Sequence, residues 1–256
     1  VINLSFGAGV LRSKQDLDEH IAEALELCRE QLGIDAFKSS SNKGCFAELI
    51  RKSKEKYGQG AVVLIDEYDK PILDNITEPE VANDMRTGLR NFYSVIKDSD
   101  ANIRFAFLTG VSKFSKVSVF SGLNNLKDIS LDPAFSAICG YTQTELESVF
   151  AEHLHDVDLD EMRSWYNGYQ WLGESVYNPF DVLLFLDTGK RFRPYWFETG
   201  TPSFLISLLK SGNYHVPDFE NMEVSSTQLS DFDIDHIRLE TLLFQTGYLT
   251  IKHEET

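Results

Sequence analysis

The sequence has few cysteines and no long hydrophobic run. Its three cysteines, Cys28, Cys45 and Cys139, are widely spaced and form no CxxC pair. This argues against structural zinc and a disulfide framework, and it favours a reducing cytoplasm. No stretch reaches about 18 consecutive apolar residues, so no transmembrane helix is predicted. The apolar start, VINLSFGAGV, lacks the basic residues of a signal peptide, and we interpret it as a buried strand.

Basic residues are also scarce. Lys and Arg total 24 against 40 Asp and Glu, which gives a net charge of −16. Nucleic acids and anionic membrane surfaces attract clustered Lys and Arg, so this balance argues against both as partners. A nucleotide is not excluded, because backbone N–H groups and a metal can hold phosphates locally. The composition therefore permits a small phosphorylated ligand and disfavours a polyanion.

Short apolar runs alternate with amphipathic stretches in the first half of the chain. Strands are predicted at residues 1–6, where apolar and polar residues alternate, and at the apolar runs 61–65 and 103–108. Helical periodicity predicts helices over residues 14–32, 45–57 and 78–97, and Gly33 is a plausible stop for the first. The order strand–helix–helix–strand–helix–strand predicts an α/β fold with a parallel sheet covered by helices on both faces.

The second half is mainly helical in pattern. Thr142 followed by Glu145 forms a capping box at the start of a helix over 142–154. Further helices are predicted within 159–169, 178–189 and 201–212, and short strands at 195–199 and 248–252. The helix, glycine turn and strand of 239–254 resemble the end of a winged-helix unit. We therefore predict two domains, a core over 1–138 and a mainly helical lid or winged-helix-like region over 139–256.

The most informative segment is AVVLIDEYDKP, residues 61–71. An apolar strand that ends in Asp and Glu is typical of the Walker B motif of P-loop ATPases. Ligands sit at the carboxyl ends of strands in open α/β sheets. There Asp66 would reach a magnesium ion, and Glu67 would orient or deprotonate the attacking water. The alternative is a buried strand that happens to end in a charged turn. Asp69 has three possible roles: it contacts the metal ligands without touching the metal, it caps the next helix, or it pairs with Lys70.

The next predicted strand ends in Thr109, which we expect to sense the γ-phosphate or the attacking water, with Ser112 as a second candidate. Lys113 and Lys116 follow and are candidates for phosphate contacts, although a solvated loop explains them equally well. Arg86 and Arg90 lie four residues apart on one helix face. One of them could act as an arginine finger, but the simpler interpretation is that they form surface ion pairs.

Aromatic residues cluster in the second half, and we interpret them mainly as core packing. Glu198 and Thr199 stand out there, because a polar pair inside an apolar stretch needs partners. The clusters are WYNGY (165–169), YNPF (177–180) and YWFETGTPSFL (195–205).

One expected motif is missing. No GxxxxGK[ST] phosphate loop occurs, and the nearest string, TGK at 188–190, lacks the upstream glycine. In a P-loop fold that loop follows the first strand. Residues 1–6 would then form the second strand, with the first strand and its loop upstream of Val1. A first residue other than Met suits a fragment of this kind.

Six ordered strings resemble a known family, the bacterial predicted AAA-ATPase-like proteins, many of which carry a PD-(D/E)xK nuclease-like region at the far C-terminus. The strings are VVLIDEYDKPILDN (62–75), FLTGVSKFSKVSVFSGLNNLKDISLDP (107–133), CGYTQTEL (139–146), WYNGY (165–169), YNPF (177–180) and YWFETGTPSFLI (195–206). The resemblance implies an ATP-binding, magnesium-dependent domain of the additional-strand P-loop class. It also implies that Asp66 and Glu67 are the Walker B pair and that an RRFGKS-type phosphate loop lies upstream. VPDFENMEV (216–224) contains PD but no (D/E)xK, so no nuclease region is predicted within these residues.

Three functions follow as hypotheses. The first is an AAA-like ATPase or ATP-dependent switch, which this stretch would not complete without its phosphate loop, so whether it acts as an enzyme stays open. The second is a non-catalytic interaction module regulated by nucleotide. The third is the ATPase part of a DNA-acting protein with a nuclease-like region. For each we expect a nucleotide as ligand, a protein partner or self-association, no membrane contact, and a cytoplasmic location.

Overall fold

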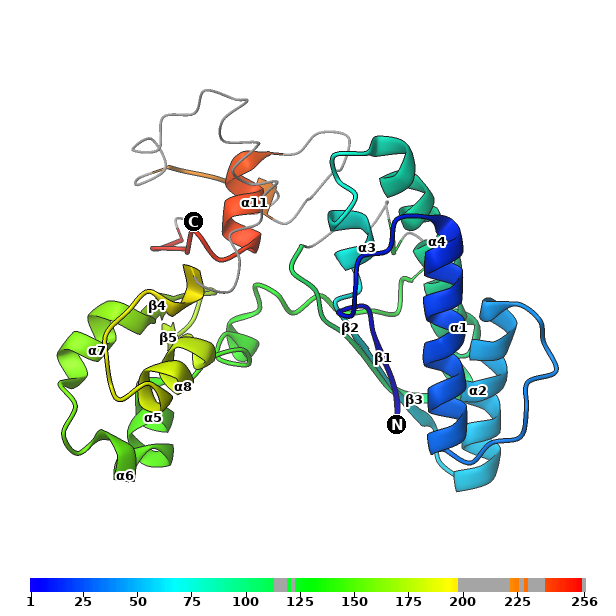
Figure 1. Cartoon of the computed structure of the whole chain (residues 1–256), viewed down its shortest axis with the longest axis horizontal. Helices are drawn as coiled ribbons and strands as arrows, with labels where there is room; N and C mark the ends of the chain where they lie inside the picture. The colour runs from blue at the N-terminus through cyan, green and yellow to red at the C-terminus, as the bar shows by residue number, and fades with distance from the viewer. Residues whose placement is uncertain (113–118, 121–122, 198–221, 226–227, 230–237, 255–256) are drawn as a thin grey trace. The chain divides into compact units, whose positions relative to one another are not determined.

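A computed structural model describes residues 1–112, 119–120, 123–197, 222–225, 228–229 and 238–254 (Figure 1). The chain divides into two compact units, Val1–Leu126 with Met222–Thr246, and Lys127–Asn221 with Gly247–Thr256. This division differs from the predicted boundary near residue 138. The segment around Pro133 packs on the second unit, since a Cβ added to Gly173 would collide with Ser136.

The first unit contains a three-stranded parallel sheet. Its strands are β1 (Ile2–Ser5), β2 (Ala61–Asp66) and β3 (Ile103–Leu108), in the order β1-β2-β3. Ser5 pairs with Asp66, and Ile65 pairs with Leu108. The carboxyl ends of the three strands therefore meet at one edge, as the sequence predicts for a parallel α/β sheet.

Three long helices pack beside this sheet: α1 (Lys14–Gln31), α2 (Asn42–Tyr57) and α4 (Pro79–Asp98). The short helices α3 (Lys70–Leu73) and η1 (Asp100–Asn102) flank α4. The Ser41 hydroxyl accepts the N–H of Gly44, so α2 begins at Asn42 rather than at the predicted residue 45. It ends at Gly58, whose φ of 68° suits glycine.

The helices cover one face of the sheet, and Figure 1 shows α1, α2 and α4 together on that side. The strand residues that face them are almost fully buried, with Ile2 and Val63 at 0% exposure. On the opposite face Val62 and Leu64 are half-buried and Phe105 is 53% exposed. The expectation of helices on both faces is thus wrong for the part of the chain that the structure describes. The apolar pattern of the strands led to that expectation, because it resembles that of a strand buried on both sides.

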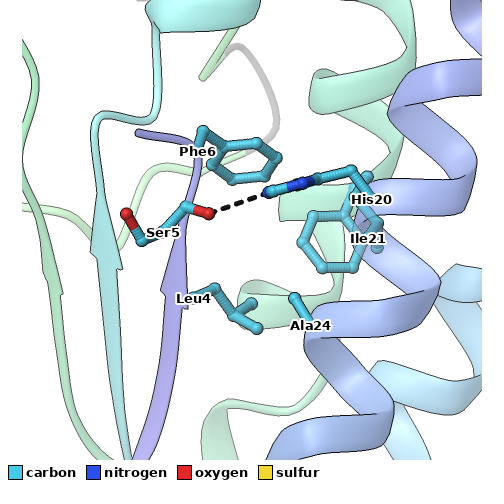
Figure 2. A pocket seen from close by; sticks show the side chains of 7 residues that line it. Leu4, Ser5, Phe6, His20, Ile21 and Ala24 are labelled. Atoms are coloured by element: carbon cyan, nitrogen blue, oxygen red, sulfur yellow. Dashed lines mark hydrogen bonds between the residues drawn. The ribbon is translucent and has the colours of Figure 1, made fainter. Parts of the chain in front are cut away.

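Figure 2 shows how α1 closes on the end of β1. The His20 Nε2 atom lies 2.9 Å from the carbonyl oxygen of Ser5, and the Phe6 ring lies 5.5 Å from the imidazole. Leu4 and Ala24 face each other below, and with Ile21 they line a gap too small for a water molecule. This dry contact holds the carboxyl end of β1, and hence the edge of the sheet, against the helical layer.

Helix α11 (Leu239–Gln245) belongs to the first unit and is followed by Gly247 with a φ of 82°. The helix and the turn were predicted, but residues 248–254 form no strand. The strand of a winged-helix-like end, predicted at 248–252, is therefore absent from the structure. Within the described ranges, no helix is both long and apolar enough to cross a membrane.

The second unit contains helices α5 (Gln143–Val149), α6 (Ala151–Leu154), α7 (Leu159–Tyr166) and α8 (Pro179–Asp187). The capping box is confirmed: Thr142 Oγ1 accepts the Glu145 N–H at 3.2 Å, and Glu145 Oε2 accepts the Thr142 N–H at 2.9 Å. The predicted helix over 142–154 is divided at Phe150.

The remaining elements of the second unit were predicted less well from the sequence. A hairpin of β4 (Asn167–Tyr169) and β5 (Val176–Tyr177) was missed, because strands this short carry no periodicity. A single turn, η2 (Pro133–Phe135), precedes α5. Another, η3 (Tyr195–Phe197), replaces the start of the strand predicted at 195–199. The helix predicted at 201–212 lies outside the described residues.

Aromatic residues form the core of the second unit, as predicted. The rings of Tyr166 and Phe185 lie 5.7 Å apart, and those of Phe185 and Phe192 lie 4.7 Å apart. Asp181 is 1% exposed in α8, and its carboxylate oxygens accept no hydrogen bond of normal geometry from the described residues. Burial raises the pKa of Asp181 to about 6, and the Trp196 backbone opposes that rise in part. A charge at this position therefore costs folding free energy.

Candidate active site

Asp66 and Thr109 meet at the carboxyl edge of the sheet. The Thr109 hydroxyl donates a hydrogen bond to Asp66 Oδ1 at 2.6 Å, and the Thr109 N–H donates to the carbonyl of Ile65 at 2.9 Å. Asp66 is exposed, and no described residue donates a hydrogen bond to its Oδ2 atom. One hard oxygen of Asp66 is therefore available to a ligand, while the other is oriented by the hydroxyl at the end of β3.

Glu67 adopts an unusual backbone conformation with a φ of 52°. A non-glycine residue in this left-handed region costs about 1–2 kcal/mol, and such residues concentrate at functional sites. Its carboxylate lies over Gly7 after β1, where an added Cβ would sit 3.2 Å from Oε2. The backbone thus directs Glu67 toward the end of β1, while Asp66 faces Thr109, the residue that follows β3. The two acids are adjacent in sequence but have separate surroundings.

Asp69 is fully buried and binds the segment that follows β3. Its Oδ1 accepts the Val111 N–H at 3.2 Å, and its Oδ2 accepts the N–H and the hydroxyl of Ser112 at 2.5 and 2.7 Å. The sequence suggested support of the metal ligands, a helix cap or a pair with Lys70. The side chain makes no capping hydrogen bond, and Lys70 pairs with Asp74 at 2.5 Å instead. Sequence reasoning missed the contact with Ser112, for which Gly110 is the only local signal.

Of the residues predicted to contact phosphate, the structure describes Ser112 but neither of the two lysines. Ser112 is 2% exposed and its hydroxyl donates to Asp69, so a phosphate contact would first have to break that hydrogen bond. Its role in phosphate binding stays a prediction. Lys113 and Lys116 lie outside the described residues, as do Glu198 and Thr199.

The roles predicted for the two arginines of α4 stay predictions. Arg86 donates to Asn83 at 2.6 Å on the same helix, and Arg90 is exposed. In the part of the chain that the structure describes, no three His, Cys, Asp or Glu side chains gather into a metal cage. Magnesium does not need such a cage, because it keeps several waters and binds one or two carboxylates together with substrate phosphates. A single available carboxylate, Asp66, fits that ion.

A parallel sheet of this kind, with two acids after its middle strand and a hydroxyl from the neighbouring strand, is consistent with a P-loop-like fold. Residues 1–120 match the model of the AAA-ATPase-like family, described as predicted AAA-ATPase. This part of the chain is therefore AAA-ATPase-like, and the resemblance seen in the sequence is confirmed for it.

The chain is also similar to a protein of Azotobacter chroococcum mcd 1 named as the uncharacterized protein in vnfD 5′ region. The two are 56% identical over 251 residues, which cover 98% of this chain and 48% of that relative. The chain thus spans about half the length of this curated relative. No solved structure matches the chain.

Proposed function

We propose that this chain is part of an AAA-like ATPase of the additional-strand P-loop class, and that β2 with Asp66 and Glu67 is its Walker B element. The observation that carries the proposal is the hydrogen bond from Thr109 to Asp66, at 2.6 Å, beside a left-handed Glu67. Asp66 would hold magnesium, directly or through water, Glu67 would orient or deprotonate water, and Thr109 would sense the γ-phosphate or that water.

The outer edge of β3 supports this proposal. Among the described residues no strand pairs with the outer side of β3, and Phe105 beside that edge is 53% exposed. Unpaired edges and exposed aromatic residues are normally covered in the complete protein. A further parallel strand there would end next to Thr109 and Asp66. A glycine-rich loop after such a strand would bring its backbone N–H groups to the phosphates of ATP.

The bound magnesium ion and the protein would have separate roles in ATP hydrolysis. The ion, bound with the phosphates, would neutralise charge that develops on them. The chain's own contribution is to hold Asp66, Glu67 and Thr109 in fixed positions at one edge. A protein partner, self-association and a cytoplasmic location stay predictions.

Replacing Asp66 by Asn tests the metal role in the full-length protein. A fluorescent ATP analogue is titrated with and without magnesium, and magnesium is expected to tighten its binding to the wild type. In Asp66→Asn we expect this gain to fall roughly 10-fold, because a neutral amide is a poor ligand for the ion or its bound water. Asp84→Asn, which changes an exposed acid on α4, is the control and should keep the full gain.

Two results would contradict the proposal. Equal magnesium dependence in Asp66→Asn and wild type would remove Asp66 as the metal-side acid. Absence of nucleotide binding by the wild type would remove the ATPase proposal as a whole.

A further inference from the structure

We propose that Asp69 is a positioning residue that ties the turn bearing Asp66 and Glu67 to the segment after β3, and so sets Glu67 relative to Thr109. This inference rests on the proposed ATPase function. It adds a residue that does not touch nucleotide, metal or water but determines where the groups that would do so are placed.

Hydrogen bonds continue to join the segments that follow β2 and β3 beyond the last residue pair of the sheet. The Tyr68 N–H donates to the carbonyl of Thr109 at 3.0 Å, and the Tyr68 hydroxyl donates to the carbonyl of Ser112 at 2.7 Å. Asp69 then accepts from the N–H groups of Val111 and Ser112. We call residues 68–69 and 109–112, joined by these bonds, the clamp. The clamp ends immediately before Lys113, one of the candidates for phosphate contact.

A carboxylate suits the centre of the clamp, because the three groups that face it are all donors. The two N–H groups and the Ser112 hydroxyl need acceptors, and an ionised Asp offers only acceptors. Burial raises the pKa of Asp69, whereas the hydrogen bonds from Ser112 and Val111 oppose that rise. An amide at this position would turn its N–H₂ toward one of these donors. Gly110 leaves the necessary space, since a Cβ there would overlap Asp69 Oδ1 and the Tyr68 ring.

The clamp acts on Glu67 through the backbone on both sides of it. Before Glu67, the Asp66 carboxylate accepts the Glu67 N–H at 3.1 Å. After it, the Tyr68 N–H is bound to Thr109, and the Tyr68 carbonyl accepts the hydroxyl of the buried Tyr93 at 3.1 Å. These bonds hold Glu67 in a left-handed conformation that it would otherwise leave. Loosening the clamp should therefore move the Glu67 carboxylate relative to Thr109, while Asp69 itself contributes no contact to the nucleotide.

The test is Asp69→Asn in the full-length protein. We expect kcat for ATP hydrolysis to fall roughly 10–100-fold, since a small misplacement of a catalytic group has effects of that size. KM for magnesium-ATP should stay within about twofold, because no ground-state contact is lost. Hydrogen exchange at the amides of Val111 and Ser112 should become faster. Ser112→Ala, which removes one of the three donors, should change kcat in the same direction by less, and it serves if Asp69→Asn does not fold.

Asn75→Ala is the matched control for a purely structural effect. Asn75 is 1% exposed, and its amide donates to the carbonyls of Leu11 and Pro71, away from the clamp. This variant should lose stability and keep its kcat per folded molecule and the slow exchange at Val111 and Ser112.

Three outcomes are informative. If Asp69→Asn keeps its kcat, or loses activity only in proportion to its unfolded fraction, as Asn75→Ala would, the positioning role is overturned. If exchange at Val111 and Ser112 is unchanged, the clamp itself is overturned. If instead the wild type and Glu67→Gln hydrolyse ATP equally, the proposed function fails, and the exchange data still decide whether Asp69 holds this segment.

Discussion

ATP turnover by the full-length protein is expected to fall roughly 10²–10⁴-fold when Glu67 is replaced by Gln, the range typical of losing a general base. The amide keeps the size of the side chain, and it can keep the contact over Gly7 that the structure shows. It cannot accept a proton from water. Nucleotide binding should persist, because Asp66 and Thr109 keep their hydrogen bond at 2.6 Å. The variant should therefore hold ATP without consuming it.

The measurement is steady-state phosphate release together with the fraction of ATP that remains bound after a single mixing. Glu80→Gln, an exposed acid in the first turn of α4, is the control and should turn over ATP at the wild-type rate. Equal, appreciable rates for Glu67→Gln and wild type would remove Glu67 as the base. Loss of both binding and turnover would show that Glu67 shapes the site rather than activating water.

The second large effect concerns Asp181 and the stability of the second unit. Its pKa is raised from 3.8 to about 6 in the folded state, so the folded protein binds this proton more tightly than the unfolded chain does. The contribution of Asp181 to the stability of the unit should therefore be greatest below about pH 4, fall as the pH rises through the interval from about 4 to 6, and stay low above it. A shift of this size corresponds to about 3 kcal/mol as an order of magnitude.

Asp181→Asn should remove this pH dependence and stabilise the unit at pH 7.5, because a neutral amide replaces a buried carboxylate that accepts no hydrogen bond of normal geometry from the described residues. Tryptophan fluorescence during urea unfolding measures the effect selectively. All three tryptophans, Trp165, Trp171 and Trp196, belong to the second unit. Asp187→Asn, an exposed acid at the end of α8, is the control and should follow the wild-type profile. A wild-type pH profile in Asp181→Asn would contradict the assignment.

The elements of the first unit were predictable because their signals are local. Apolar periodicity places α1 and α4 to within a residue or two, and the run of apolar residues before Asp66 marks β2. Cap residues were similarly informative, as Thr142 and Glu145 show. Placing Asp66 and Thr109 at the ends of strands needed no more than strand boundaries and the rule that ligands bind at carboxyl ends.

What failed depended on contacts between distant parts of the chain. Among the described residues the predicted second layer of helices and the strand after Gly247 are missing, because a local apolar pattern does not say which segment covers a strand or pairs with it. The contact between Gly173 and Ser136 is also invisible to local patterns, since the two residues are far apart in sequence.

The sequence by itself determined the kind of strand that bears Asp66 and Glu67, because an apolar run that ends in two acids is written in consecutive residues. The resemblance to AAA-ATPase-like proteins depends on the same kind of local string. Only the tertiary structure decided that the Thr109 hydroxyl donates a hydrogen bond to Asp66 and that the Glu67 side chain turns toward Gly7. It also decided that the buried Asp69 accepts a hydrogen bond from the Ser112 hydroxyl. These contacts follow from the register of parallel strands that are separated by whole helices, and no local pattern encodes that register.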